Sequence, residues 1–189
     1  MKTKIQEIIK EDIAVKQEIL KSQVANIEKA ASVIISSFKK GGKLLICGNG
    51  GSAADAQRIA AEFVGRFKKE RKALPAIAFT TNTSILTAIA NDYGYDFVFK
   101  RQVEALAKRN DVLLGISTSG NSKNILEAVK LANKMGIVTI SLTGNGGGKL
   151  AKLAKLSIIV PSKNTPRIQE SHIAIGHIIC ELVEDYSPN

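Results

Sequence analysis

The sequence is poor in cysteine and has no long apolar run. Its two cysteines, Cys47 and Cys180, lie far apart in apolar segments, so we expect buried free thiols of a reducing compartment and no disulfide. No apolar stretch is long enough to span a bilayer, and the N-terminus alternates charged and apolar residues where a signal peptide would have an apolar core. These absences argue against a membrane-spanning or secreted class and favour a cytoplasmic protein.

Aromatic residues are also scarce, at 5% of the chain, and no nucleic-acid-binding motif is present. The net charge is +10, but the basic residues are spread along the chain and mostly interleaved with acidic ones, as in Lys10-Glu11-Asp12. One denser basic run, residues 66–72, is where a polyanion could bind. Charge alone is weak evidence for such a partner, so we expect a solvated surface and no nucleic acid.

Glycine and proline are absent from residue 3 to about residue 39, where apolar residues recur at helical spacing. This segment predicts one very long helix or two, with Ser22 or Asn26 capping the second and the pair Gly41 and Gly42 at its end. The whole chain, with 189 residues and 44% apolar content, has the size of a single domain. An arm formed by residues 1–40 is too long to pack entirely on one small sheet, so we expect it to contact a neighbouring subunit of a homo-oligomer.

Downstream of the arm, apolar strands alternate with helices. The expected strands cover residues 43–47, 75–79, 111–116, 138–144 and 156–160, and the expected helices cover 53–66, 84–91, 97–108, 123–134 and 149–155. Strands that are apolar throughout and alternate with helices indicate a parallel sheet covered on both faces. The predicted fold is therefore a three-layer α/β/α sandwich, with ligands bound at the carboxyl ends of its strands.

The first strand runs directly into a glycine turn, residues 49–52. Small residues let backbone amides approach a ligand, Ser52 can cap the following helix, and a helix N-terminus attracts anions, so a phosphate group is expected. A dinucleotide site is the alternative, because Gly48-Asn49-Gly50 begins like G-x-G-x-x-G. Ala53 stands at the third glycine position, however, and no acidic residue follows the next strand, so we expect no nucleotide cofactor.

A second turn, rich in hydroxyl groups, follows the third strand. This serine turn, residues 117–122, contains Ser117, Thr118, Ser119 and Ser122, whose side chains and backbone could donate to three phosphate oxygens. An ordinary turn of serine and glycine is the alternative interpretation. The hydroxyl groups are more numerous than such a turn requires, so we expect a phosphate site.

Four segments together resemble the phosphoheptose isomerases, which belong to the sugar isomerase (SIS) domain superfamily. They are CGNGGSAADAQ at residues 47–57, NDYG at 91–94, GISTSGNS at 115–122 and RIQESHI at 167–173. The resemblance covers nearly the whole chain and implies a single SIS domain over residues 1–189, with flavodoxin-like topology, assembled as a tetramer. It also implies an aldose–ketose isomerase that converts D-sedoheptulose 7-phosphate into D-glycero-D-manno-heptose 7-phosphate through an enediol. That reaction is the first step towards the nucleotide-activated heptose of bacterial surface polysaccharides such as lipopolysaccharide.

By this resemblance, Glu62 and His177 form the catalytic acid/base pair, and the sequence leaves open which of them abstracts the carbon-bound proton. Without the resemblance, Glu62 could be a solvated carboxylate and His177 a structural histidine. His172 lies about 140° from His177 around an ideal helix, so we expect it to be structural. The residues implied to arrange the sugar are Asn49, Gly50, Gly51, Ser52, Arg66, Asn91, Asp92 and Gln169, and those implied to hold the phosphate are Ser117, Thr118, Ser119 and Ser122.

Members of this family that bind zinc use a histidine one helical turn before the glutamate, together with the equivalents of Glu62, Gln169 and His177. Arg58 occupies the histidine position here, and a guanidinium has no lone pair for a metal, so at most three ligands remain. We therefore expect zinc binding to be weakened or absent, and Arg58 to form an ion pair with Glu62 on one helix face. Arg58 also keeps open a second function, that of a noncatalytic SIS-domain protein that associates with the bacterial replication initiator.

Overall fold

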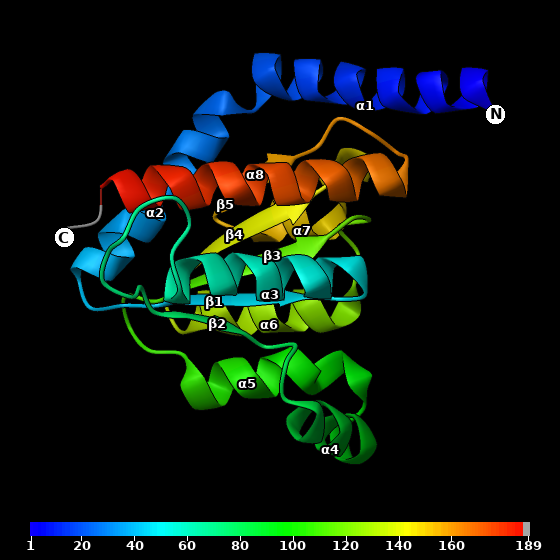
Figure 1. Ribbon diagram of the computed structural model, residues 1–189. Helices are drawn as coiled ribbons and strands as arrows, with labels where there is room; N and C mark the ends of the chain where they lie inside the picture. The colour runs from blue at the N-terminus through cyan, green and yellow to red at the C-terminus, as the bar shows by residue number, and fades with distance from the viewer. Residues whose placement is uncertain (187–189) are drawn as a thin grey trace.

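The computed structural model describes residues 1–186 and has a central sheet of parallel strands between two layers of helices (Figure 1). The order of the strands across the sheet is β2-β1-β3-β4-β5, which is the flavodoxin-like order. The predicted α/β/α sandwich with a parallel sheet is confirmed. The strands are β1 (Leu44–Gly48), β2 (Ala76–Ala78), β3 (Val112–Ser117), β4 (Val138–Thr143) and β5 (Leu156–Ile159).

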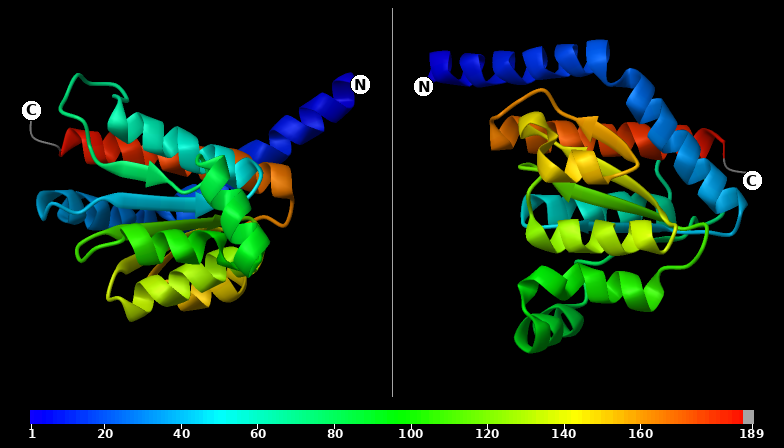
Figure 2. Two further views of the ribbon diagram at one scale, coloured as in Figure 1. Left: turned by 90° about the horizontal axis from the view of Figure 1, so that it is seen from below. Right: turned by 180° about the vertical axis from the view of Figure 1, so that it is seen from behind.

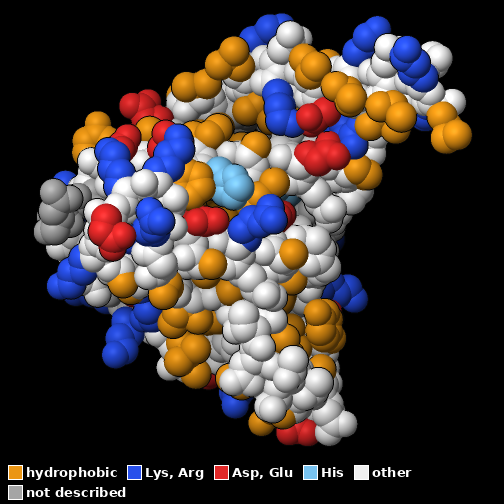
Figure 3. Space-filling view, in the orientation of Figure 1, with side chains coloured by type: hydrophobic (Ala, Val, Ile, Leu, Met, Phe, Trp, Pro, Cys, Tyr) orange, Lys and Arg blue, Asp and Glu red, His pale blue; other side chains and the backbone are white. Residues whose placement is uncertain are grey.

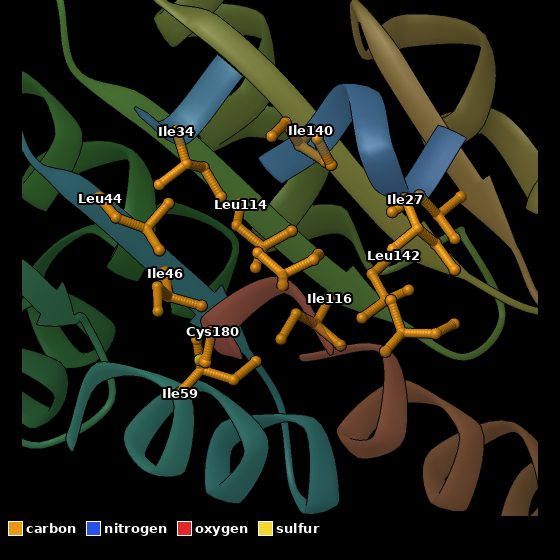
Figure 4. Packing of buried hydrophobic residues seen from close by; sticks show 14 of the residues in the cluster. Ile27, Ile34, Leu44, Ile46, Ile59, Leu114, Ile116, Ile140, Leu142 and Cys180 are labelled. Atoms are coloured by element: carbon orange, nitrogen blue, oxygen red, sulfur yellow. The ribbon is translucent and has the colours of Figure 1, made fainter. Parts of the chain in front are cut away.

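One face of the sheet is covered by α2 (Val24–Lys39), α3 (Gly51–Val64) and α8 (Thr165–Asp185). Apolar side chains from all three helices meet the same strand face, because alternate strand residues point to the same side. Burial of this surface is the main source of stability on this side of the sheet. Figure 4 shows Ile27 and Ile34 of α2, Ile59 of α3 and Cys180 of α8 packed against Leu44, Ile46, Leu114, Ile116, Ile140 and Leu142.

The opposite face is covered by α5 (Val98–Leu106), α6 (Lys123–Lys134) and α7 (Gly148–Leu153). A short η2 turn (Asn145–Gly147) precedes α7. The helix α4 (Thr83–Tyr93) lies at the outer edge of this layer, and the turn η1 (Tyr95–Phe97) joins it to α5 (Figure 1). The predicted helix at residues 97–108 therefore starts in a 3₁₀ turn and ends at Leu106.

The N-terminal arm consists of two helices, α1 (Lys2–Ser22) and α2, which meet at Gln23. At the bend, the Gln23 side-chain oxygen accepts the Ile159 backbone N–H at the end of β5 at 3.1 Å, which connects the arm to the sheet. The caps predicted at Ser22 or Asn26 are wrong, since Gln23 occupies the cap position of α2 and makes no side-chain capping bond. Figure 2 shows that α1 extends beyond the body of the domain.

The structure shifts the predicted helix around the glycine turn. α3 begins at Gly51, and its N-cap is Gly50 with φ 55° and ψ −121°. Glycine reaches a positive φ without steric strain, so the chain enters the helix two residues earlier than predicted. Ser52 is buried inside the first turn and makes no capping bond, so the predicted Ser52 cap is wrong. Because α3 ends at Val64, Arg66 lies beyond the helix.

Both cysteines are free and buried, as predicted. Burial raises the pKa of the Cys47 thiol to about 12, so this cysteine stays protonated and unreactive at neutral pH. Within residues 1–186, no helix combines the length and the apolar content that crossing a bilayer requires.

Candidate functional site

The two predicted turns lie together at one edge of the sheet. β1 and β3 are neighbours, yet the chain leaves β1 towards β2 on one side and leaves β3 towards β4 on the other. Such a switch point opens a crevice at the carboxyl ends of the two strands. The glycine turn follows β1 and the serine turn ends β3, so both border this crevice.

The serine turn holds itself together through its own hydroxyl groups. The Ser117 hydroxyl lies 2.9 Å from that of Ser122 and 3.5 Å from that of Ser119. Ser119 also accepts the Asn121 backbone N–H at 3.2 Å, and Thr118 is half-buried in the same turn. Ser122 is the N-cap of α6, so the positive end of this helix lies next to the hydroxyl cluster.

The backbone of the loop after β4 supports the serine turn from outside. The Asn121 side-chain oxygen accepts the Lys149 backbone N–H at 3.2 Å. Gly120 has a φ of 64°, and a Cβ atom there would lie 2.1 Å from the Gly147 carbonyl oxygen. Only glycine permits both this conformation and this close approach, so the glycine-rich loop and the serine turn depend on each other.

The glycine turn is held by side chains from distant parts of the chain. The Asn49 and Asn124 side-chain amides donate to each other at 3.0 and 2.8 Å, and the Tyr95 hydroxyl lies 3.2 Å from the Asn49 oxygen. Neither Asn124 nor Tyr95 was predicted from the sequence. The sequence could have pointed to Asn124, because it is a polar residue in the first turn of an amphipathic helix directly after the serine turn. Tyr95 had no signal apart from its position next to the NDYG segment.

The start of α8 packs on both the glycine turn and the loop after β4. A Cβ atom at Gly51 would lie 2.5 Å from the Gln169 side-chain nitrogen, and one at Gly144 would lie 2.4 Å from Ile168. The neighbouring Arg167 donates to the Ile8 carbonyl of α1 at 3.0 Å. The RIQE segment therefore connects the arm, the loop after β4 and the glycine turn.

Glu62 and His177 lie on helices that run side by side. Gly51 of α3 faces Gln169 of α8, and Ile59 packs on Gly176, so each residue of α3 lies level with the residue about 117 positions later. This register brings His177 beside the helical turn that carries Glu62. His172 is completely buried, so the histidine visible in Figure 3 is His177.

The surroundings of this pair are partly apolar. The His177 ring lies 5.4 Å from the Phe67 ring, and its Nε2 atom is buried without a hydrogen-bond partner among residues 1–186. Cys180, one helical turn later, has a pKa raised to about 12 by burial and, to a smaller extent, by the Glu62 carboxylate. A half-buried carboxylate and an imidazole with a free nitrogen can together donate and accept protons.

A buried ion pair holds the loop after α3 close to Glu62. Glu184 is 4% exposed and accepts the backbone N–H groups of residues 67, 68 and 69, together with the Arg71 Nε at 3.1 Å. Arg71 in turn donates to the carbonyl oxygens of Glu62 and Phe63 at 2.7 and 2.9 Å. Burial would raise the pKa of Glu184, but these amides and the Arg71 charge outweigh it, and the pKa is lowered. No local sequence pattern predicts this clamp, because its partners are far apart in the chain.

Several predicted site residues form no hydrogen bond or ion pair with the two turns, with Glu62 or with His177 in the described part of the chain. Asn91 and Asp92 are exposed at the end of α4 and hydrogen bond to each other at 2.9 Å. Arg66 is exposed and lies 3.9 Å from Glu70. Their places in the substrate site stay predictions.

Arg58 forms no ion pair with Glu62 in the described part of the chain, so that expectation is wrong. Arg58 is exposed, and an ion pair formed at a helix surface gains little Coulomb energy and loses side-chain entropy. Arg58 instead acts on Asp55, whose pKa burial raises to about 6 against the lowering effect of the guanidinium.

The residues implied for zinc do not form a complete site within one chain. Within residues 1–186, no group of three or more His, Cys, Asp and Glu side chains is arranged to hold a metal. Gln169 lies level with Gly51, 11 residues before Glu62, which corresponds to about 16 Å along an α-helix. Within one chain, Gln169 and Glu62 are therefore too far apart to bind the same metal ion. Arg58 offers no lone pair. The expectation of weakened or absent zinc stays a prediction.

Comparisons with known proteins agree with the fold. The SIS domain family profile matches residues 9–144. The chain is 54% identical to a phosphoheptose isomerase of Aquifex aeolicus over 185 residues, which cover 98% of this chain and 97% of that protein. A solved phosphoheptose isomerase from Neisseria gonorrhoeae has a TM-score of 0.92 at 46% identity, with 97% and 98% of the two chains covered. One from Francisella tularensis has a TM-score of 0.94 at 38% identity, with 97% of each chain covered. The chain therefore belongs to the SIS domain family and, within it, to the phosphoheptose isomerases.

Proposed function

We propose that this protein interconverts D-sedoheptulose 7-phosphate and D-glycero-D-manno-heptose 7-phosphate through an enediol, the first step towards a nucleotide-activated heptose. The observation that carries this proposal is the packing of α3 on α8, with a carboxylate, Glu62, beside an imidazole, His177. The reaction needs one group that moves a proton from C1 to C2 and another that moves a proton from O1 to O2. The pair can supply both functions.

The phosphate end of the substrate belongs at the serine turn in this proposal. The Ser119 and Ser122 hydroxyl groups each lie within 3.5 Å of the Ser117 hydroxyl, and the N-terminus of α6 adds backbone donors. Such an arrangement suits a dianion with several acceptor oxygens. The sugar then extends along the glycine turn, where Asn49, Gly51 and Gln169 meet.

We further infer that the active unit is a homo-oligomer, a tetramer by resemblance. Glu62 lies 11 residues along α3 from the glycine turn, which is about 16 Å. An extended seven-carbon sugar phosphate spans only about 10 Å from C1 to phosphorus, at roughly the rise per bond of an extended chain. One substrate therefore cannot reach from the glycine turn to Glu62 of the same chain. We expect a second copy to supply Glu62 and His177.

The arm offers a surface for this assembly. α1, α2 and α8 border an open apolar groove of about 580 Å³ that includes Leu20, Val24 and Ile178, each of them exposed. Ile5, Ile9 and Ile13 of α1 are also exposed, and rows of exposed isoleucine are typical of an interface. Light scattering should give the mass of a tetramer, and Leu20→Asp should lower it. A monomeric native chain would contradict the assembly.

Mixed oligomers test the shared site directly. Glu62→Gln and the double variant Ser117→Ala/Ser119→Ala are each expected to be inactive in the isomerase assay. If one copy supplies the serine turn and another supplies Glu62, refolded mixtures of the two variants should recover up to about a quarter of native activity. Mixtures that stay inactive, with native oligomers present, would contradict the shared site.

The proposed reaction itself is tested by following the aldose by NMR after adding sedoheptulose 7-phosphate. Native protein should produce it, whereas Glu62→Gln and His177→Ala should lose at least about a hundredfold in kcat. No turnover by native protein, with or without added zinc, would favour the noncatalytic, initiator-associating function that Arg58 keeps open.

Zinc is expected to be weakly bound or absent, because Arg58 replaces a ligand of the zinc-binding relatives. No step of the proposed reaction depends on it. Metal analysis of protein purified without added metal should find well under one zinc per chain. Arg58→His should raise zinc affinity by at least about tenfold, since it restores an imidazole donor. Tightly held, stoichiometric zinc in the native protein would contradict this expectation.

We place the protein in the cytoplasm. Both cysteines are free and buried, which is the usual state in a reducing compartment. No nucleotide cofactor, nucleic acid or membrane partner is part of the proposal.

A further inference from the structure

Tyr95 contacts the glycine turn from a part of the chain to which no role has been assigned. It lies in η1, directly after the NDYG segment, and its hydroxyl lies 3.2 Å from the Asn49 side-chain oxygen across a sequence separation of 46 residues. The rest of the ring is exposed, with 56% of the residue's surface accessible. The hydroxyl contact is therefore not a by-product of core packing.

A chain of hydrogen bonds fixes the direction of this contact. The Ile125 backbone N–H can only donate, and it lies 3.0 Å from the Asn124 side chain, so the atom facing it must be the Asn124 oxygen. The Asn124 nitrogen consequently points at Asn49 and donates to its oxygen at 2.8 Å. The atom of Asn49 that faces Tyr95 is therefore an acceptor, and the phenol donates to it.

This arrangement leaves Asn49 with one free donor. Its oxygen accepts from both Asn124 and Tyr95, which uses both lone pairs. Its nitrogen gives one N–H to the Asn124 oxygen at 3.0 Å, so one N–H remains without a partner in the described part of the chain. Asn49 is half-buried at the carboxyl end of β1, where the substrate crevice opens.

We infer that Tyr95 is a positioning residue that holds the Asn49 amide so that its free N–H donates to an oxygen of the sugar. This inference depends on the proposed isomerase function and adds a residue to it. A preoriented amide donor stabilises charge that develops on a sugar oxygen as the enediol forms, at no cost of reorientation. Without the phenol, Asn49 keeps only its pairing with Asn124 and can rotate away.

Tyr95→Phe removes only the hydroxyl, and Tyr93→Phe is its matched control. Tyr93 lies two residues earlier, is 55% exposed, and makes a ring contact with Arg101 but no hydroxyl hydrogen bond among residues 1–186. We expect Tyr95→Phe to lower kcat/KM for sedoheptulose 7-phosphate by about fivefold to tenfold, the effect of one hydrogen bond. Tyr93→Phe should change it by less than about twofold, and both variants should unfold at the native temperature.

The route through Asn49 is tested by a double-mutant cycle. In an Asn49→Ala background, Tyr95→Phe should change kcat/KM by less than about twofold, because its target is gone. Equal effects of Tyr95→Phe in the two backgrounds would overturn the inference, as would an unchanged kcat/KM in the native background.

A spectroscopic measurement separates this inference from the proposed function. In ¹⁵N NMR spectra, Tyr95→Phe should shift the Asn49 side-chain amide resonances, and Tyr93→Phe should not. Unshifted resonances would overturn the inference even in an active enzyme. If Tyr95→Phe shifts the resonances but the native protein shows no turnover, the hydrogen bond is supported and the isomerase function is refuted. The substrate role of Tyr95 is then overturned with it.

Discussion

The serine turn and the glycine turn lie side by side but are held by different kinds of contact. In the serine turn, hydroxyl groups within five residues of one another form the hydrogen bonds. In the glycine turn, the contacts come from Tyr95, Asn124 and Gln169, which are 46 or more residues away. A local motif can therefore be altered one hydroxyl at a time, whereas the glycine turn depends on three distant elements remaining docked.

The largest effect is expected at Gly120, where the serine turn packs against the loop after β4. Gly120→Ala forces a side chain onto a φ of 64° and against the Gly147 carbonyl, which should cost about 4 kcal/mol of unfolding free energy in urea titrations. Gly136→Ala is the control, because its φ is 75° but no atom of the described residues lies within 4 Å of the added Cβ. It should cost only about 1 kcal/mol. Equal costs would mean that the loop after β4 does not support the turn.

Acid should weaken the support of the glycine turn. His172 lies one turn after Gln169 on α8, and burial lowers its pKa to about 4, which the Thr143 backbone only partly opposes. The unfolded chain, with a pKa near 6.5, binds this proton first, so stability falls as pH decreases from about 6.5 to 4. The loss should reach about 3 kcal/mol, measured as the difference between native protein and His172→Gln.

The difference between variants is needed because other groups titrate in the same range. Asp55 has a pKa raised to about 6 by burial, which favours the folded state on acidification. Glu184 has a lowered pKa, so its contribution is lost at lower pH. A His172→Gln variant with the same pH dependence as native protein would refute the assignment to His172.

A methyl group at the start of α3 should separate activity from stability. Gly51→Ala improves helix propensity, but its Cβ displaces the Gln169 amide. We expect about a thirtyfold loss of kcat/KM with an unfolding free energy no lower than native. The loss should not add to that of Gln169→Ala. Full additivity would show that the close contact between these residues has no functional role.

The smallest effect is expected for one hydroxyl of the serine turn. Ser122→Ala removes the 2.9 Å contact with Ser117, and α6 loses no cap bond because Ser122 makes none. KM should rise about fivefold with kcat unchanged, since the phosphate is remote from the reacting carbons. An equal fall in kcat would argue that the serine turn contributes to the chemistry as well as to binding.

Much of the fold could be read from the sequence. Apolar strands alternating with helices gave the parallel sheet, and the boundaries of α6, residues 123–134, were predicted to the residue. The turn at residues 117–122 was predictable from its hydroxyl-rich sequence, because its hydroxyl hydrogen bonds join residues that are close in the chain. The predicted caps at Ser52 and at Ser22 or Asn26 were wrong, because the chain enters α3 through a positive φ at Gly50 and Gln23 occupies the cap position of α2.

The sequence by itself determined the layers of the fold, the position of both turns at one sheet edge and the chemical character of the serine turn. These follow from periodicity and from contacts between residues close in the chain. Only the tertiary structure decided the orientation of Asn49, the Arg71–Glu184 clamp behind Glu62 and the register of α3 on α8. Each depends on side chains separated by 46 to 118 residues, and no local pattern specifies which of them will meet.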